Sequence, residues 1–273
     1  MAVITVSRQM GSLGTEIGRD LAKQLNYDYA DKERIGQMLM GYGLPEPEVD
    51  KFDEKKPPFW DSFSLQRRKF LHLTQAVIYD LSSKGRVVIV GRGGQVLLKD
   101  VPGTLHVRIT APFDVRVRRL IETQGWDEKH ATRFLRQSDR DSSGYIQTFF
   151  NVNWDDPNLY DLTLNSQKLA LETAIKLIID SAHSPEIQGK EEQAQEKLAD
   201  LALVQKAEAR LVDLLGIDLR HVEVGMEKGI VFLKGTVVST QIRENCEEVV
   251  STLEGIKRVE NLLAVSQYYR FGL

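Results

Sequence analysis

Residues 4–16 read ITVSRQMGSLGTE, an apolar run followed by a glycine-containing turn and the start of a helical pattern. The apolar run predicts a buried strand, and the spacing of apolar residues over 16–25 predicts a helix. Between them, Gly11 and Gly14 allow backbone N–H groups to converge at a helix N-terminus, an arrangement that holds phosphate well. The alternative is a turn that needs glycine only for its geometry, because the full G-x-x-x-x-G-K-[ST] pattern is absent.

A second segment, residues 88–94, reads VIVGRGG and again ends an apolar run in glycines, now with Arg92 among them. In an open α/β sheet, ligands bind at the carboxyl ends of the strands, and Arg92 would emerge there. A guanidinium group binds phosphate through two parallel hydrogen bonds. Arg92 is therefore a candidate phosphate ligand, with a surface arginine beside a tight turn as the alternative.

Outward from these segments, strand patterns alternate with helical patterns through about residue 180. Further strands are predicted over 105–109 and 159–164, and helices over 65–81, 113–122, 127–140 and 168–179. Such alternation predicts a doubly wound α/β fold with a parallel sheet. Residues 44–63 are different, because their prolines and many charges predict an irregular excursion over the surface.

Arginines gather on the helices predicted over 113–122 and 127–140. On the second helix, Arg133, Arg136 and Arg140 are spaced three and four residues apart and therefore lie along one stripe. Phosphoryl transfer is catalysed by positioning and by neutralising charge on the transferring group, which a stripe of arginines would do by closing over the phosphates. The alternative is a solvated face whose arginines pair with neighbouring acids.

Length and composition are those of an ordinary globular protein: 273 residues, 42% hydrophobic and 27% charged, with a net charge of −3. This balance gives no electrostatic basis for nucleic-acid binding, so a nucleotide site would need a local cluster of basic residues. The single cysteine, Cys246, excludes an intrachain disulfide, and the scattered histidines lack metal-ligand spacing, so no metal ligand is assigned. The N-terminus reads as a strand and no window would span a bilayer, so we expect a soluble cytoplasmic protein.

The composition changes after the last helix of this series, where a polar segment over 184–197 predicts a linker. Beyond it, an amphipathic helix over 199–215 precedes two strands, another helix and a last strand. This α-β-β-α-β order predicts a small α+β domain over 198–267, following an α/β domain over 1–183. No pair of convergent acids and no nucleophile mark the second domain as catalytic.

Five segments resemble the cytidylate kinase-like proteins, in the same order and over about residues 1–180: residues 4–18, 29–33, 88–94, 139–140 and 159–165. The resemblance implies the fold of a P-loop nucleoside monophosphate kinase that uses ATP and Mg²⁺ to phosphorylate CMP or dCMP. By match, the ATP phosphate loop comprises Gly11, Ser12, Leu13, Gly14 and Thr15. The resemblance also implies that Asp31 and Arg92 bind the monophosphate and that a lid brings the catalytic residues Arg136 and Arg140 to the transferring group.

One position departs from the family pattern. Ordinary members of the wider kinase group carry a lysine after the last loop glycine, whereas the corresponding residue here is Gly14. Nearby, Glu16 would either approach a magnesium ion or disfavour a triphosphate, and the cations that would compensate are Arg8, Arg19 and Lys32. Three functions therefore stay open: a nucleoside monophosphate kinase, a nucleotide-sensing regulatory protein with weak or no turnover, and a kinase whose acceptor is not a nucleotide.

Residues 198–267 resemble a BON domain in three segments, 222–224, 229–237 and 255–262, where glycine turns border short alternating strands. The resemblance implies binding to a protein partner or a membrane surface, and not catalysis. A folded appendage with no ligand of its own is the alternative.

Overall fold

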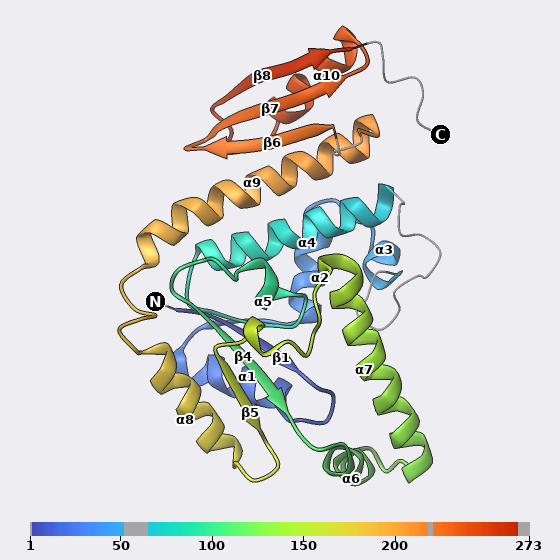
Figure 1. The fold of residues 1–273 in the computed structure, drawn as a ribbon, viewed down its shortest axis with the longest axis vertical. Coiled ribbons are helices and arrows are strands. Elements are labelled where there is room, and N and C mark those ends of the chain that lie inside the picture. Colours follow the sequence, from blue (N-terminus) through green and yellow to red (C-terminus); the bar gives the residue numbers. More distant parts are fainter. Residues whose placement is uncertain (1, 52–64, 218–220, 267–273) are drawn as a thin grey trace.

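In this computed structural model, the described residues are 2–51, 65–217 and 221–266. A five-stranded sheet lies at the centre of the N-terminal part, with the strand order β2-β3-β1-β4-β5 (Figure 1). Its strands are β1 (Val3–Arg8), β2 (Asp28–Ala30), β3 (Val87–Val90), β4 (Thr104–Thr110) and β5 (Leu162–Asn165). All neighbouring strands are parallel, which confirms the predicted doubly wound α/β fold.

Two strands differ from the sequence-based expectation. The sequence does not predict β2, because three residues are too few to show a strand period. β5 begins at Leu162 and not at residue 159, because Pro157–Leu159 form a 3-10 helix, η1. Asp156 caps that helix by accepting a hydrogen bond from the N–H of Asn158 (2.9 Å).

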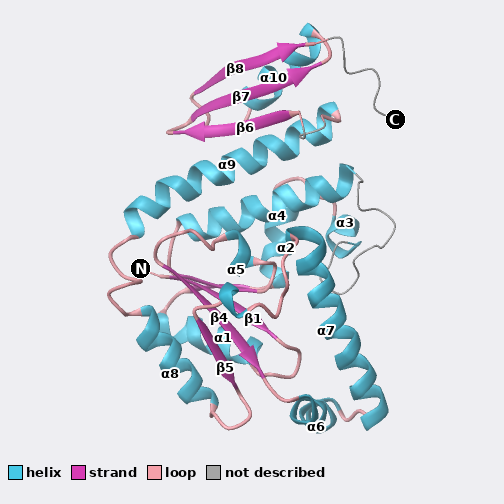
Figure 2. Cartoon of the chain, in the orientation of Figure 1, coloured by secondary structure: helices cyan, strands magenta, loops and turns pink. Residues whose placement is uncertain are grey.

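The central strands supply two hydrophobic cores, one on each face of the sheet. Val3, Val87 and Ile89 contribute to one core, and their neighbours Ile4 and Val88 contribute to the other. Helices α2 (Lys32–Gly41), α4 (Leu65–Ser83) and α5 (Gly94–Leu97) cover the first face, and α1 (Gly14–Leu25) and α8 (Leu171–Ala182) cover the second (Figure 2). Because side chains alternate between faces along a strand, a sheet covered on both sides needs strands that are apolar throughout.

Two helices follow β4: α6 (Phe113–Gln124) and α7 (Glu128–Phe150), and α7 runs along one side of the molecule (Figure 1). Asp127 caps α7 by accepting a hydrogen bond from the N–H of His130 (2.8 Å). The helix extends beyond its predicted end at Arg140, because Tyr145 and Ile146 are buried in a small cluster with Trp154. The extension carries aromatic side chains toward the turn that follows β3.

The segment 44–63 contains a helix, α3 (Glu46–Lys51), where the sequence predicts an irregular excursion. Pro47 falls in the first turn of this helix, where its missing N–H removes no helical hydrogen bond. The rest of that prediction, residues 52–63, lies outside the described residues.

The C-terminal part confirms the predicted α-β-β-α-β order. Its elements are α9 (Glu191–Leu215), β6 (Val222–Glu227), β7 (Ile230–Val237), α10 (Thr240–Ser251) and β8 (Arg258–Val265). The strands form a separate sheet in which β6 and β7 are antiparallel and β8 joins β7 in parallel. α9 lies between this sheet and α4 (Figure 1).

Helix α9 takes part in two hydrophobic cores. It begins at Glu191, inside the segment predicted as a linker, and its residues Ala194 and Leu198 belong to the core that α4 shares with the large sheet. Further along, Ala207 and Leu211 belong to the core of the small sheet. One helix thus joins the two predicted domains, whose boundaries stay a prediction. Among the helices in the described ranges, none has the length and apolar character to cross a bilayer.

Candidate active site

Residues 9–13 connect β1 to α1 at the carboxyl edge of the sheet. Gly11 and Leu13 have positive φ angles of 76° and 64°, and within the turn the N–H of Ser12 donates to the Gln9 carbonyl (3.1 Å). Leu13 is the N-cap residue of α1, and its apolar side chain forms no capping hydrogen bond. The N–H groups in the first turn of α1 are therefore not capped by this residue, and a helix N-terminus favours an anion.

A cavity of about 220 Å³, here called the loop cavity, opens beside these residues. Three cations line it from separate elements: Arg8 at the end of β1, Lys32 at the start of α2 and Arg119 on α6. Glu16 is the one carboxylate residue that lines it within the described part of the chain. The loop cavity is thus locally cationic in a protein of net charge −3, as binding of a polyphosphate requires.

Arg119 binds the loop backbone through hydrogen bonds. Its Nη1 donates to the Gly11 carbonyl (3.1 Å) and to Ser166 Oγ (3.0 Å), and its Nη2 donates to the Ser166 carbonyl (2.7 Å). Ser166 Oγ then donates to the Ser12 carbonyl (2.7 Å). Because these contacts occupy two loop carbonyls, they hold the backbone of the loop in one orientation.

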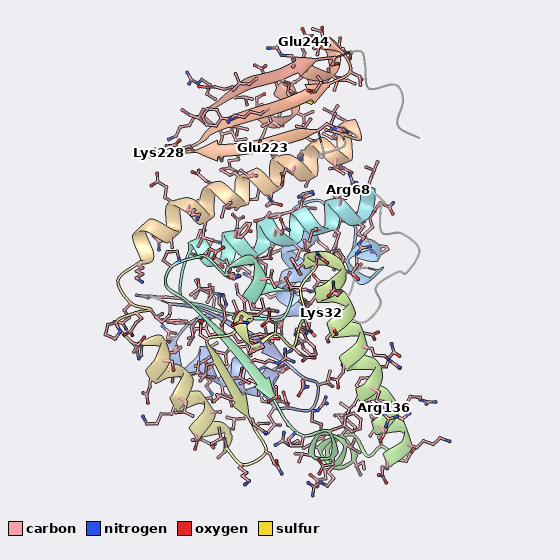
Figure 3. The ribbon with its side chains drawn as sticks, viewed as in Figure 1. Lys32, Arg68, Arg136, Glu223, Lys228 and Glu244 are labelled. Atoms are coloured by element: carbon pink, nitrogen blue, oxygen red, sulfur yellow. The ribbon has the colours of Figure 1, made fainter. Side chains whose placement is uncertain are left out.

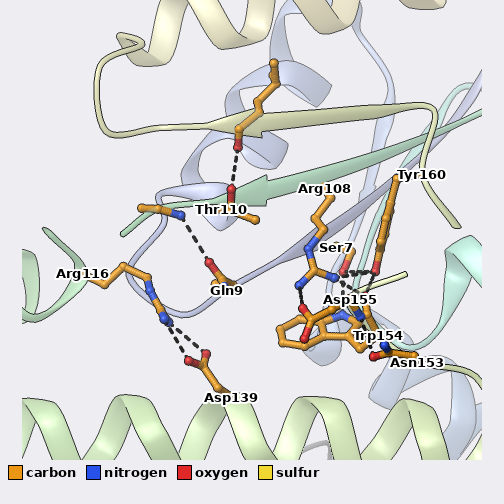
Figure 4. Close-up of polar contacts among 12 residues, drawn as sticks. Ser7, Gln9, Arg108, Thr110, Arg116, Asp139, Asn153, Trp154, Asp155 and Tyr160 are labelled. Carbon is orange, nitrogen blue, oxygen red and sulfur yellow. Dashed lines mark hydrogen bonds and ion pairs between the residues drawn. The ribbon is translucent and has the colours of Figure 1, made fainter. Parts of the chain in front are cut away.

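Arg116 ties α6 to α7 through Asp139 (Figure 4). Its Nη1 and Nη2 donate to the two carboxylate oxygens of Asp139, both at 2.9 Å, and Nη1 also lies 3.3 Å from the Met10 carbonyl. The Arg116 side chain is 4% exposed and the Asp139 side chain 29% exposed, so the guanidinium is shielded from water while the carboxylate is half-buried. Asp139 therefore pairs with an arginine of α6, and not with the arginines of its own helix.

Arg92 follows β3 and is buried, with 1% of its surface exposed. A second cavity of about 20 Å³, here called the Arg92 cavity, lies beside it and is lined by Ser7, Trp154 and Tyr145 among others. The guanidinium carbon of Arg92 lies 6.0 Å from the centre of the Phe70 ring. Arg92 is thus a buried cation at the carboxyl end of the strand next to β1.

The end of α7 closes the Arg92 cavity. A Cβ atom on Gly93 would lie 2.3 Å from the ring of Phe150, so this ring rests directly on the turn. Phe150, Phe149 and Tyr145 form one aromatic cluster, with ring centres 4.7 Å apart for Tyr145 and Phe149 and 6.5 Å apart for the two phenylalanines. A cavity of 20 Å³ is too small to hold a nucleotide in this arrangement of α7.

A polar network holds Ser7 and Trp154, two of the residues that line the Arg92 cavity (Figure 4). Trp154 Nε1 donates to Ser7 Oγ (2.9 Å) at the end of β1. Arg108 on β4 donates to the Trp154 carbonyl and to the Tyr160 hydroxyl, and it also pairs with Asp155. Because Arg108 is 5% exposed and its ring neighbours are packed against it, Trp154 is held in one position.

The structure brings the predicted phosphate loop and Arg92 close together. Arg8 and Ser142 line both the loop cavity and the Arg92 cavity, so the two cavities adjoin. Of the predicted loop residues, Gly11, Leu13, Gly14 and Thr15 line the loop cavity, and Ser12 is fully buried.

Asp31 is the N-cap residue of α2. Its carboxylate accepts hydrogen bonds from the N–H groups of Glu33 and Arg34, both at 3.1 Å, and so caps α2. This cap sets the start of α2, from which Lys32 reaches the loop cavity. Asp31 itself does not line either cavity in the described structure.

Arg136 and Arg140 lie outside both cavities. Their side chains are exposed on α7, whereas Ser138 and Ser142 of the same helix line the loop cavity. Figure 3 marks Arg136 toward the α6 end of α7, apart from Lys32. The residues of α7 that line the loop cavity are therefore two uncharged serines.

Sequence reasoning missed the roles of Arg119 and Ser166. Arg116 and Arg119 are three residues apart, so their shared helical face was a usable signal. No sequence pattern indicates that this face meets the loop, because the contact of Arg119 with Gly11 joins residues 108 positions apart. Among the cations named as compensation, Arg19 lines neither cavity, and its guanidinium carbon lies 5.9 Å from the Tyr29 ring centre.

Comparisons with known proteins agree with this architecture. The model of the cytidylate kinase-like family matches residues 3–168, and the BON domain model matches residues 199–267. The cytidylate kinase of Pyrobaculum islandicum is 23% identical over 184 residues, which cover 66% of this chain and 92% of that protein. A crystal structure of an uncharacterized protein from Eubacterium ventriosum shares the fold, with a TM-score of 0.52 and 22% identity over 67% of this chain and 99% of its own.

A further similarity is local. A stretch of 104 residues, 38% of this chain, is 30% identical to the uronate isomerase of Corynebacterium glutamicum. The chain spans only 20% of the length of that enzyme, so the similarity concerns a small part of it.

Proposed function

The chain belongs to the cytidylate kinase-like family, and from this membership we propose that it transfers the γ-phosphoryl group of ATP to a nucleoside monophosphate, CMP or dCMP. The observation that carries the proposal is the junction of the two cavities at Arg8 and Ser142. One cavity offers uncapped helix N–H groups and cations to a polyphosphate, and the other offers a buried arginine to a second phosphate. Two adjoining phosphate sites are what a phosphoryl transfer between nucleotides requires.

For the donor, the loop residues Gly11 to Thr15 would hold the phosphates of ATP through their backbone N–H groups. Magnesium fits the loop cavity, because Thr15 and Glu16, which both line it, carry side-chain oxygens and oxygen ligands suit this ion. When bound, the ion would neutralise charge on the β- and γ-phosphates.

For the acceptor, Arg92 would bind the monophosphate, with Asp31 holding the start of α2 in place. The closed Arg92 cavity supports a cycle in which the end of α7 withdraws to admit the acceptor. The same movement of α7 would be needed to bring Arg136 and Arg140 to the transferring group, because both are exposed in the present arrangement.

The test is a coupled assay of ADP formation with Mg·ATP and a panel of nucleoside monophosphates. We expect turnover that depends on the monophosphate, with CMP or dCMP preferred. Arg92→Ala and Arg92→Lys should raise the KM for the monophosphate at least about tenfold, the effect of losing one charge-assisted interaction. Arg118→Ala, which removes an exposed arginine of α6, is the matched control. Absence of ADP formation with every monophosphate would refute the proposal.

A second candidate function is a nucleotide-sensing regulatory protein whose C-terminal part binds a protein partner or a membrane surface. Two observations favour it: glycine at position 14 in place of a lysine, and a helix, α9, that is shared by both hydrophobic cores. Calorimetric binding of a nucleotide without any turnover would support this function over the kinase.

A further inference from the structure

The segment from Arg8 to Thr15 differs from the usual phosphate-loop sequence in which of its positions carry a side chain. In the pattern G-x-x-x-x-G-K-[ST], a lysine follows the second glycine and a hydroxyl residue follows the lysine. With Thr15 at the hydroxyl position, Gly14 stands at the lysine, Leu13 at the second glycine and Arg8 at the first glycine. A cationic side chain is therefore absent from the seventh position of the pattern and present at the first.

The two positions compete for the same space. A Cβ atom built on Gly14 would lie 2.4 Å from Arg8 Cβ and 3.1 Å from Arg8 Cγ, with Ile109 Cβ at 3.1 Å on another side. Non-bonded carbon atoms do not approach to 2.4 Å, so a side chain at position 14 is incompatible with the one at position 8. With Arg8 present, position 14 has room only for glycine. The absence of the lysine is therefore linked to the presence of Arg8.

Arg8 lies where the two candidate phosphate cavities adjoin. It is the one cationic residue that, in the described chain, lines both the loop cavity and the Arg92 cavity. Lys32 and Arg119 line only the loop cavity, and Arg119 is also hydrogen-bonded to Gly11 and Ser166. The transferring phosphoryl group would pass between the two cavities, beside Arg8.

We propose that Arg8 is a catalytic residue that replaces the loop lysine and neutralises the transferring γ-phosphoryl group. This inference rests on the proposed kinase function. An oxygen of the acceptor phosphate attacks the γ-phosphorus, and the bond from that phosphorus to the β–γ bridging oxygen breaks. The electron pair of that bond stays on ADP, and the acceptor leaves as a nucleoside diphosphate. The positive charge of Arg8 neutralises the negative charge on the non-bridging oxygens throughout the reaction, and Arg8 transfers no proton.

The experiment compares steady-state kinetics of the full chain with Arg8→Gly, Gly14→Lys and the double variant Arg8→Gly/Gly14→Lys. Arg8→Gly should lower kcat on the order of 10²–10³-fold, the usual effect of removing one donor from a transition-state charge, with a smaller change in the KM for the monophosphate. Gly14→Lys alone should be inactive, because the new side chain collides with Arg8. The double variant has the residue types of the ordinary pattern at both positions. Its kcat should be at least about tenfold higher than that of Arg8→Gly.

Two further variants separate catalysis from folding. Arg8→Gln keeps most of the side chain but removes the charge, so it should match Arg8→Gly in kcat while unfolding in urea at the midpoint of the unchanged protein. Arg19→Ala removes a cation that lines neither cavity and should keep full kcat.

The outcomes distinguish this inference from the function on which it rests. If the unchanged protein shows no turnover, the kinase function fails and the role of Arg8 fails with it. If the unchanged protein turns over but Arg8→Gln keeps its kcat, the kinase stands and the role of Arg8 is refuted. A double variant that is no more active than Arg8→Gly would also refute the claim that Arg8 takes the role of a lysine at position 14.

Discussion

The guanidinium of Arg116 and the carboxylate of Asp139 meet through two hydrogen bonds of 2.9 Å, which join α6 to α7 (Figure 4). Asp139→Asn removes the charge opposite a guanidinium that is 4% exposed. We expect the free energy of unfolding to fall by about 1.5–3 kcal/mol, as for a lost hydrogen bond to a buried charged group. Urea denaturation measures this change.

The matched control for that variant is Asp141→Asn on the same helix, where the carboxylate accepts a hydrogen bond from the neutral side chain of Gln137 (2.6 Å). Its effect should stay within about 0.5 kcal/mol, the range for surface substitutions. Equal losses in Asp139→Asn and Asp141→Asn would contradict a stabilising role for the bidentate pair.

Arg119→Ala should weaken ATP binding by about tenfold or more, because the loop loses the donor that holds the Gly11 carbonyl and the contacts to Ser166. Arg118→Ala is the control from the same helix, since its guanidinium is 66% exposed and pairs only weakly with Asp114 (3.5 Å). Calorimetric titration with ATP gives the dissociation constants. Similar affinities of the two variants would show that Arg119 does not brace the loop.

Gly93→Ala tests the contact that closes the Arg92 cavity. Gly93 and Gly125 both have positive φ, but a Cβ on Gly93 meets the Phe150 ring at 2.3 Å, while a Cβ on Gly125 meets nothing within 4 Å. Gly125→Ala should therefore cost only the backbone strain, about 1–2 kcal/mol, and Gly93→Ala should cost more. In a Phe150→Ala background, Gly93→Ala should cost no more than Gly125→Ala does. If the urea midpoints of Gly93→Ala and Gly125→Ala agree, Phe150 does not rest on this turn.

Leu198→Ala and Leu214→Ala make the same change at two places on α9. Leu198 is 1% exposed in the core shared with α4, whereas Leu214 is 56% exposed. We expect a loss of about 2–5 kcal/mol for Leu198→Ala, the range for a buried leucine, and within about 0.5 kcal/mol for Leu214→Ala. Both values come from urea denaturation of the full chain, and comparable losses would place the start of α9 outside the N-terminal core.

Stability should fall in mild acid because of His106. Burial lowers the pKa of His106 from 6.5, an effect that the carboxylate of Asp161 partly offsets, and Thr5 Oγ1 lies 2.8 Å from His106 Nδ1. Below pH 6.5 the unfolded chain takes up a proton at this position that the folded chain resists. The free energy of unfolding therefore decreases as the pH falls, by at most about 1.4 kcal/mol per pH unit from this group.

The measurement is urea denaturation at pH 7.5 and at pH 5.5. His106→Gln should show a smaller loss between the two values than the unchanged protein does, whereas His183→Gln, which alters an exposed histidine, should show the same loss. An unchanged pH dependence in His106→Gln would assign the acid sensitivity to other groups.

Local sequence patterns predict the type and order of most elements correctly. Apolar runs and helical spacing indicate four of the five strands of the large sheet and the α-β-β-α-β order of the C-terminal part, because these patterns depend on residues only a few positions apart. For the same reason β2 and α3 escape sequence reasoning: three residues show no period, and the prolines around α3 resemble those of an irregular segment.

Which charged residues meet at the candidate site follows from the packing of the elements and not from the sequence patterns. Helical spacing places Arg136 and Arg140 on one stripe of α7, but it cannot tell which stripe faces the loop, and the structure turns Ser138 and Ser142 toward it. Likewise, the exclusion of a side chain at Gly14 follows from its distance to Arg8. Contacts of this kind depend on how separate elements pack against one another, and no local pattern in the sequence records that packing.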